Sequence, residues 1–183
     1  YAVMANQFPL PTLEDLLRWA RSYRGIGAIP IAVDCGEKKP TRMGWQAEDG
    51  SDAVLQATLV EGGNLGLLLG EPSGGLIDVD LDCDCAVAFA PYFLPETPWK
   101  SGHTDRPGSH WWYRTTAGTC SKSKQRHGPG KGSPMWVELR SAPLQTVVPP
   151  SIYPGSQSRY EWVGGWQPAG PAVVDGGYLY RCV

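Results

Sequence analysis

The sequence contains no run of about 18 apolar residues, and no basic segment precedes an apolar stretch near residue 1. These absences argue against membrane insertion and against secretion. The five cysteines are an odd number, and Cys83 and Cys85 lie too close together in sequence to bridge each other comfortably. We therefore expect a soluble protein of the reducing cytoplasm that has no membrane partner.

Several motifs of common enzymes are also missing. The sequence has no Walker A loop, no glycine-rich dinucleotide fingerprint and no G-x-S-x-G elbow of a serine hydrolase. Its cysteines and histidines lack the C-x₂₋₄-C and H-x₃₋₅-H spacings of a structural zinc site. Nothing in these patterns predicts a P-loop enzyme, a dinucleotide-dependent enzyme, a serine hydrolase or a zinc module.

The chain has no excess of positive charge, since its formal net charge is −2 and its pI is about 5.9. It therefore cannot coat a nucleic acid by bulk charge. Residues 106–137 nevertheless carry six basic side chains and no Asp or Glu. This local patch predicts contact with a polyanion, and Trp111, Trp112 and Trp136 within it belong either to the core or to a base-stacking surface.

The composition favours short strands and turns over a helical bundle, because the 183 residues include 23 glycines and 17 prolines. We expect one α+β domain over residues 1–183, excised from a longer protein. Periodicity predicts helices over residues 12–24, 51–60 and 83–93, and strands over 26–33, 64–70, 76–80, 110–114, 135–140 and 146–148. Strands 64–70 and 76–80 are expected to form a hairpin, and the polar segment 121–133 is expected to be a mobile loop.

The most informative motif is Asp78-Val79-Asp80 at the end of a predicted strand. Strand side chains alternate between faces, so the two carboxylates point to one side. Such a pair either binds Mg²⁺ or Mn²⁺ or forms a solvated acidic turn. An EF-hand is excluded, because its sixth position would be Cys83 and its twelfth Phe89.

Two further residues are candidates for the same chemistry. Glu138 lies in a predicted strand between apolar neighbours, and it pairs either with a cation beside Asp78 and Asp80 or with Arg140. His110 begins another predicted strand, where it serves either as a core hydrogen-bonding residue or as a donor to a triphosphate.

Seven short segments occur along the chain in a fixed order, and they are Gly27-Ala28-Ile29-Pro30, Lys39-Pro40 with Trp45, Asn64-Leu65-Gly66 with Gly70, Asp78-Val79-Asp80, Ser109-His110 with Tyr113, Val137-Glu138-Leu139-Arg140, and Val148-Pro149-Pro150-Ser151. Taken together, these segments resemble the N-terminal catalytic domain of bifunctional DNA primase/polymerases, in the archaeo-eukaryotic primase superfamily. The resemblance covers roughly residues 15–165.

The resemblance implies a fold and a set of site residues. A small αβ part, about residues 12–75, would pack on an antiparallel sheet similar to an RNA-recognition motif, about residues 76–165, with the active site in the cleft between them. Asp78, Asp80 and Glu138 would bind two Mg²⁺ or Mn²⁺ ions, and His110 would contact the triphosphate. The family usually has Asp where this chain has Glu138. Its second-motif hydroxyl normally lies two residues before the histidine, whereas here Ser109 is adjacent to His110.

We therefore expect a template-directed nucleotidyltransferase that uses nucleoside triphosphates on single-stranded DNA. Such domains often accompany a helicase in plasmid or phage replication. Arg140 is expected to orient Glu138. Besides His110, the predicted nucleotide contacts are Ser109, Lys122, Lys124, Arg126, Arg140 and Ser151. The predicted nucleic-acid contacts are Arg114, Lys131 and Trp112.

Three other functions remain open at this point. The first is an inactive nucleic-acid-binding module of a replication initiator. The second is a metal-dependent phosphodiesterase that uses the same carboxylates. The third is a carbohydrate-binding module, which the eight tryptophans suggest but which leaves the acids and the basic segment unexplained.

Overall fold

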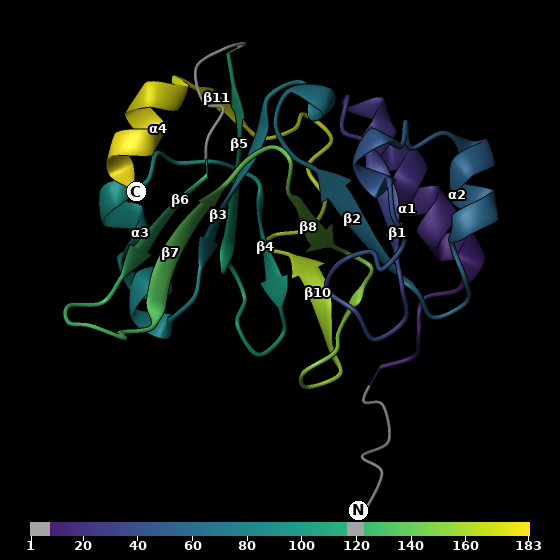
Figure 1. Ribbon diagram of the computed structural model, residues 1–183, viewed down its shortest axis with the longest axis horizontal. Coiled ribbons are helices and arrows are strands. Elements are labelled where there is room, and N and C mark those ends of the chain that lie inside the picture. The colour runs from purple at the N-terminus through teal and green to yellow at the C-terminus, as the bar shows by residue number, and fades with distance from the viewer. Residues whose placement is uncertain (1–7, 117–122) are drawn as a thin grey trace, which may run out of the picture.

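Two β-sheets lie side by side in the computed structural model, which describes residues 8–116 and 123–183 (Figure 1). The small sheet has three strands in the order β1-β2-β8. The large sheet has eight strands, seven of them in the order β6-β7-β3-β5-β4-β10-β9, while β11 pairs with β5. All pairings are antiparallel except that of β11 with β5, which is parallel. The expected α+β class is confirmed.

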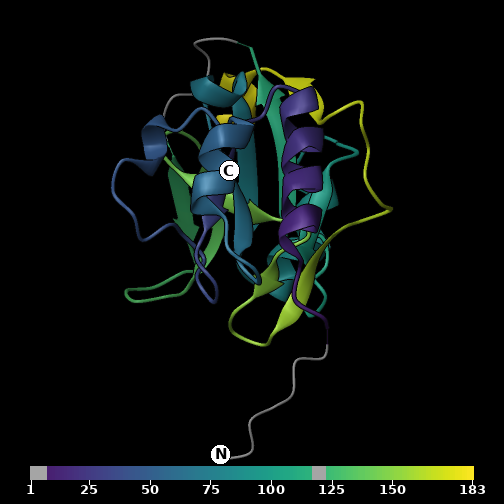
Figure 2. The same cartoon turned by 90° about the vertical axis from the view of Figure 1, so that its right-hand side faces the viewer.

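Two helices cover the outer face of the small sheet (Figure 2). α1 (Leu13–Gly25) begins where the Thr12 hydroxyl accepts a hydrogen bond from the Asp15 amide, and α2 (Asp52–Thr58) begins at Ser51 in the same way. Leu16, Ala20 and Tyr23 lie at helical spacing and are fully buried. The strands beneath the helices are β1 (Pro30–Val33), β2 (Asn64–Leu68) and β8 (Gln145–Val148).

The large sheet is built mainly from the second half of the chain. Its strands are β3 (Leu76–Leu81), β4 (Lys100–His103), β5 (His110–Thr115), β6 (Lys124–His127), β7 (Met135–Arg140), β9 (Ile152–Tyr153), β10 (Ser158–Trp162) and β11 (Ala172–Val174). Helices α3 (Asp84–Phe93) and α4 (Gly176–Cys182) lie on the side of this sheet away from the small sheet (Figure 1).

The large sheet separates two hydrophobic cores. On one face, Ile77, Val79 and Leu81 pack with residues of α3 and α4, including Ala90 and Leu179. On the other face, tryptophans of the large sheet pack against α1 and the small sheet, and these are Trp99, Trp112 and Trp162. The second core joins the two sheets into one hydrophobic interior.

The predicted hairpin of residues 64–70 and 76–80 is wrong, because its two strands belong to different sheets. β2 pairs with β1 and β8, whereas β3 pairs with β5 and β7. Gly70 (φ +79°) and the 3₁₀ turn η2 (Glu71–Ser73) redirect the chain between the sheets, and one isolated bridge from Gly70 to Leu76 remains. β8 lies within the expected 76–165 sheet part, yet it pairs with β2 in the small sheet.

Two other elements differ from expectation. Residues 124–127 of the predicted loop form the edge strand β6, which pairs with β7. The strand predicted over 26–33 is shorter, since Gly27 (φ +76°) lies in a turn that follows α1. A second 3₁₀ turn, η1 (Trp45–Ala47), lies between β1 and α2.

Within residues 8–116 and 123–183, none of the helices combines the length and apolar character needed to cross a bilayer.

Candidate functional site

Strand register brings the predicted acids together on one face of the large sheet. Asp80 lies opposite His110 on β5 and opposite Glu138 on β7, while Asp78 lies opposite Arg140. Directly opposed residues of antiparallel strands point to the same face, as do residues two apart along one strand. These five side chains therefore share one face, which we call the acid face.

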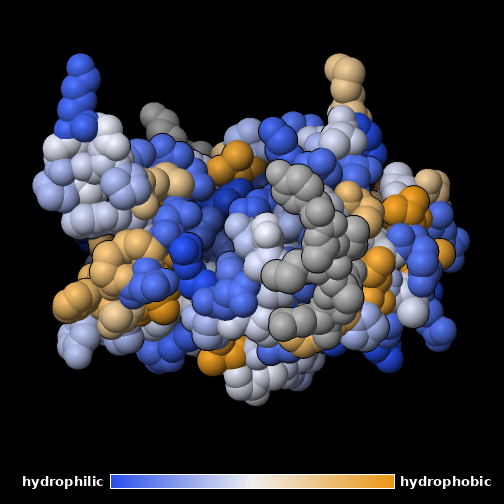
Figure 3. Space-filling model, turned by 90° about the horizontal axis from the view of Figure 1, so that it is seen from below, coloured by the Kyte–Doolittle hydropathy of each residue, from blue (hydrophilic) through white to orange (hydrophobic). Residues whose placement is uncertain are grey.

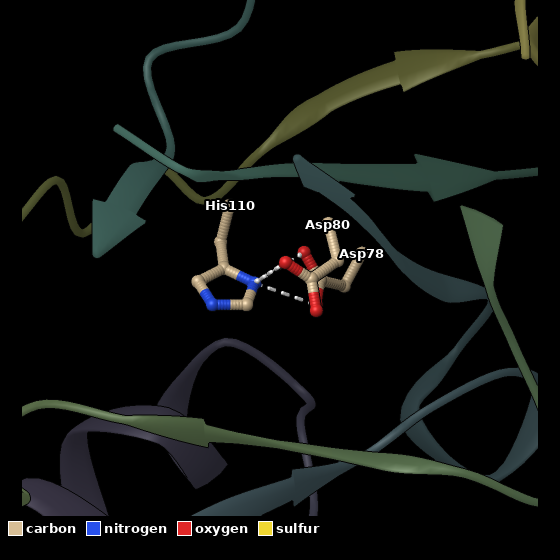
Figure 4. A group of neighbouring side chains, drawn as sticks. All are labelled: Asp78, Asp80 and His110. Atoms are coloured by element: carbon tan, nitrogen blue, oxygen red, sulfur yellow. Dashed lines mark hydrogen bonds and ion pairs between the residues drawn. The ribbon is translucent and has the colours of Figure 1, made fainter. Parts of the chain in front are cut away.

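Asp78, Asp80 and His110 form the most compact group on the acid face (Figure 4). Each offers a ligand atom, and these atoms all lie within 4.8 Å of one another. His110 Nδ1 is 3.0 Å from Oδ2 and 3.2 Å from Oδ1 of Asp78, and 3.6 Å from Oδ1 of Asp80. Asp78 is fully buried, so its carboxylate is held by protein groups rather than by solvent.

The two carboxylates keep His110 protonated. Burial alone would lower the pKa of this imidazole, but the charges of Asp78 and Asp80 and the hydrogen bond to Asp78 outweigh burial and raise the pKa to about 9. Nδ1 faces the acids, whereas Nε2 points away from them (Figure 4). A protonated ring can therefore donate to the acids from one nitrogen and to another anion from the other.

Arg140 links the remaining acids of this face. Its Nη1 is 3.2 Å from Asp80 Oδ2 and 3.7 Å from Glu138 Oε2, and its Nη2 donates to the Gln145 carbonyl at 2.8 Å. Burial opposes the charge of the guanidinium, but Asp78, Asp80 and Glu138 leave its pKa raised. Glu138 therefore makes the ion pair with Arg140 that the sequence left open, and it lies outside the compact Asp78, Asp80 and His110 group.

Asp82 extends the acid series beyond the predicted pair. Burial, together with the negative charges of Asp80 and Glu138, raises the pKa of Asp82 to about 6. Its buried Oδ2 meets no hydrogen-bond partner in the part of the chain that the structure describes. A buried carboxylate oxygen without a hydrogen bond is energetically unfavourable, and a nearby cation would stabilise it. Asp82 lines the same cavity as Asp80 but is not part of the compact group, whose two carboxylates, from Asp78 and Asp80, suit a hard divalent cation.

A cavity of about 110 Å³ opens above the acids and receives residues from both sheets. Asp80, Asp82 and Arg140 line it from the large sheet and its connections, whereas Lys38 and Gln145 line it from the small sheet and its connections. Its space exceeds that of several water molecules. Hydrophilic residues surround a hollow on the face of the molecule seen from below (Figure 3).

Basic and aromatic side chains line the same cavity. Lys38 Nζ lies 4.3 Å from the centre of the Tyr153 ring, and that ring stacks on His103 with centroids 4.2 Å apart. Arg106 lies on the β4–β5 connection, where its Nη1 donates to the Asp82 carbonyl at 3.0 Å. The cavity therefore combines carboxylates with cationic groups, as the binding of a polyanion together with a metal ion requires.

Ser109, which was predicted to contact the nucleotide, is buried and lines the cavity wall. Lys124 and Arg126 do not reach this cavity. They lie opposite Leu139 and Val137, which puts them on the other face of the sheet from Glu138. Lys124 Nζ donates to the Tyr180 carbonyl at 2.6 Å, and Arg126 Nε donates to the Val183 carbonyl at 2.5 Å. Neither side chain lines the cavity, and Lys122, the third lysine or arginine of this segment predicted to contact the nucleotide, lies outside the described residues.

Three other predicted contacts have structural roles. Trp112 is fully buried and donates to the Ser101 hydroxyl, so it offers no ring face to a base. Ser151 is also fully buried, and its hydroxyl accepts from the Leu65 amide at 2.8 Å within the small sheet. The Arg114 guanidinium donates to backbone carbonyls of the β2–β3 connection and of the turn after α1. Lys131 is exposed between β6 and β7, where a phosphate could reach it.

Several residues around the acid face have no recognisable signal in the local sequence. Gln145 and Thr146 lie on β8, and the Thr146 hydroxyl donates to Asp78 Oδ2 at 2.7 Å. Neither residue forms a recognisable motif with an acid almost 70 positions earlier. Gln125 lies on the segment taken for a loop, and it donates to Glu138 Oε1 at 2.8 Å. Lys38 directly precedes Lys39-Pro40, and this pair, one of the segments of the family resemblance, is the local sequence feature that points to residues 38–40.

Comparison with known proteins places the chain beside one described family. The family model described as bifunctional DNA primase/polymerase, N-terminal, matches residues 9–172. No curated protein matches the chain. The matched segment covers well over half of the chain, and it includes the small sheet, all strands of the large sheet except most of β11, and the five residues of the acid face.

Proposed function

The chain belongs to the family of bifunctional DNA primase/polymerase N-terminal domains, and from this premise we propose that its acid face joins nucleotides on a single-stranded DNA template. The observation that carries the proposal is the compact group of Asp78, Asp80 and His110 beside a cavity that also contains basic side chains. Nucleotidyl transfer needs both, because carboxylates hold divalent cations and cationic side chains hold phosphates.

Asp78 and Asp80 would hold Mg²⁺ or Mn²⁺, with Glu138 as the third acid for a second ion. When bound, such ions supply positive charge to the triphosphate and lower the pKa of the attacking 3′-hydroxyl. Asp78 is fixed by burial, and Asp80 is fixed by its contact with Arg140. Glu138 must exchange its contact with Arg140 for a cation to take this role.

The nucleotide phosphates would contact the basic residues of the cavity. His110 directs Nε2 away from the acids, so this nitrogen can donate to a phosphate oxygen when it carries a proton. Lys38 and Arg106 line the same cavity from other elements. These two residues replace Lys124 and Arg126 as the proposed cationic contacts of the triphosphate.

The DNA template requires a separate contact surface. Among the basic residues predicted for it, Lys131 is exposed on the β6–β7 connection, and we propose that it contacts template phosphates. Neither Trp112 nor Arg114 is proposed here, because the first is buried and the second is engaged by backbone carbonyls. A helicase partner and a plasmid or phage replicon remain proposals that follow from the resemblance.

The test is nucleotide incorporation by the purified protein. Wild type and the double variant Asp78→Ala/Asp80→Ala are incubated with single-stranded DNA, labelled nucleoside triphosphates and Mn²⁺ or Mg²⁺, with and without a primer. Glu14→Gln serves as the matched control, because Glu14 is an exposed acid on α1. We expect products from wild type and Glu14→Gln, and a loss of at least about 1000-fold in the double variant, since both cation ligands are removed.

The same assay separates the other functions. Products without a primer would show primase activity, and products with a primer only would restrict the protein to extension. Shortened DNA without nucleoside triphosphates would show a phosphodiesterase. DNA binding without any product, in wild type and the double variant alike, would overturn the polymerase proposal in favour of a binding module.

A further inference from the structure

One side chain of the small sheet reaches across to the acid face. Thr146 lies on β8, opposite Leu67 of β2, and its Oγ1 donates to Asp78 Oδ2 at 2.7 Å. Both residues are buried, since Thr146 is 3% exposed and Asp78 is 0% exposed. The contact therefore joins two sheets at the most buried acid of the site.

Few groups fix the Asp78 carboxylate. Among the described residues, the hydrogen-bond donors found at its oxygens are His110 Nδ1 and Thr146 Oγ1. His110 comes from β5, the neighbouring strand of the same sheet, whereas Thr146 approaches from the small sheet. The plane of the carboxylate is therefore set from two directions by two different sheets.

We propose that Thr146 is a positioning residue, whose hydroxyl holds the Asp78 carboxylate in the orientation that binds a divalent cation. The proposal rests on the proposed function only in taking Asp78 as a cation ligand. It assigns to Thr146 no contact with the substrate and no part in the reaction itself.

The chemistry of threonine suits this role. A β-branched side chain in a strand has restricted χ1, so its hydroxyl is directed before any ligand arrives. A hydroxyl that donates to a carboxylate makes a short, charge-assisted hydrogen bond, which occupies one lone pair of Oδ2 and leaves others for a cation. Groups that orient metal ligands in this way typically change metal affinity by about 10–100-fold when they are removed.

A second contact between the two sheets lies next to that of Thr146. Arg140 Nη2 donates to the carbonyl of Gln145, the residue before Thr146, while Arg140 Nη1 contacts Asp80. The same short stretch of β8 is therefore tied to both acids of the Asp78-Val79-Asp80 motif. A displacement of β8 relative to the large sheet would therefore disturb the Thr146 contact with Asp78 and the Gln145 contact with Arg140 at the same time.

The experiment measures Mn²⁺ binding by isothermal titration in the full chain. Wild type is compared with Thr146→Val, which keeps the shape and removes the hydroxyl, and with Thr146→Ser, which keeps the hydroxyl. We expect Thr146→Val to weaken Mn²⁺ binding at least about tenfold and Thr146→Ser to stay within about threefold of wild type. The midpoint of urea unfolding is recorded for each variant, and Thr146→Cys replaces Thr146→Val if the latter does not fold.

Each outcome decides the proposal independently of polymerase activity. Equal Mn²⁺ affinity of Thr146→Val and wild type would overturn it, as would equal losses in Thr146→Ser and Thr146→Val. A wild type that binds no Mn²⁺ would overturn it as well. A wild type that binds Mn²⁺ through a Thr146-dependent site but incorporates no nucleotide would support this inference while the proposed function fails.

Discussion

The same strands of the large sheet place acidic side chains on one face and apolar side chains on the other. Along β3, Asp78 and Asp80 face the site, while Ile77, Val79 and Leu81 face the core beneath α3 and α4. The strands β5 and β7 alternate in the same way. Packing of the apolar face stabilises the strands, and this stabilisation offsets the repulsion between carboxylates that lie close together on the other face.

Placing a charged side chain on the apolar face should have the largest effect on the stability of the fold. Val79→Asp introduces a carboxylate into the fully buried face, and we expect it to destabilise the fold by about 4 kcal/mol or more. Urea unfolding followed by tryptophan fluorescence measures this change. The matched substitution at the next position, Asp80→Asn, should stay within about 2 kcal/mol of wild type, because it relieves repulsion with Asp82. Comparable stabilities of the two variants would contradict the division between the faces.

The charges of the acid face predict a pH dependence in metal-free protein. Burial opposes protonation of His110, but Asp78 and Asp80 raise its pKa from 6.5 to about 9 on folding. A raised pKa stabilises the fold fully below about pH 6.5, and this contribution is lost as pH rises through about 9. We expect a loss on the order of 3 kcal/mol across this range in the presence of EDTA.

The control for this pH dependence is His110→Gln, which has no titrating group at the position. Its free energy of unfolding should vary less between pH 6.5 and about pH 9.5 than that of wild type. Parallel pH profiles of the two proteins would show that the acids do not hold a protonated imidazole.

The contribution of the cavity's basic side chains to nucleotide binding can be tested at Lys38. Lys38→Met keeps most of the aliphatic stem and removes the charge that faces the cavity, so we expect the KM for nucleoside triphosphate to rise by about tenfold. Steady-state incorporation at varied nucleotide concentration measures it. Lys39→Met is the matched control, because Lys39 is exposed and is not among the residues that line the cavity. An equal rise in both variants would argue against a specific contact of Lys38.

The smallest effect on nucleotide binding is expected from basic residues on the face of the large sheet away from the cavity. The double variant Lys124→Ala/Arg126→Ala removes two basic residues that contact the segment containing α4 and Val183. We expect nucleotide KM within about twofold of wild type, because neither side chain faces the cavity. The measurement is the same steady-state assay. A tenfold rise would restore these residues as nucleotide contacts and would contradict the strand register at β6.

Much of the acid face was predictable from local alternation. The two-residue period placed Asp78 and Asp80 on one side, and the structure confirms this placement. The predicted strand 135–140 matches β7, which carries Glu138 and Arg140. Such predictions succeed where a short segment has alternating apolar residues, because the burial of one face is visible in the sequence itself.

The failures concern information that local sequence does not contain. Lys124 and Arg126 lie in a polar, turn-rich segment, so neither the strand nor its facing was predicted. Trp112 is buried because the small sheet covers that part of the large sheet, and the composition of its strand does not reveal this cover. Thr146 meets Asp78 because the chain passes from β7 in the large sheet to β8 in the small sheet, where β8 pairs with β2. This long-range pairing has no signature in either segment.

The central claim is that a divalent cation binds on the acid face, between Asp78 and Asp80. Fe²⁺ substituted for Mg²⁺, with ascorbate and peroxide, cleaves the polypeptide near the bound ion, and mass spectrometry locates the cuts. We predict cuts within residues 78–82 and around His110, suppressed by excess Mg²⁺ and absent from Asp80→Asn. Cuts elsewhere, or an identical pattern in Asp80→Asn, would contradict the account.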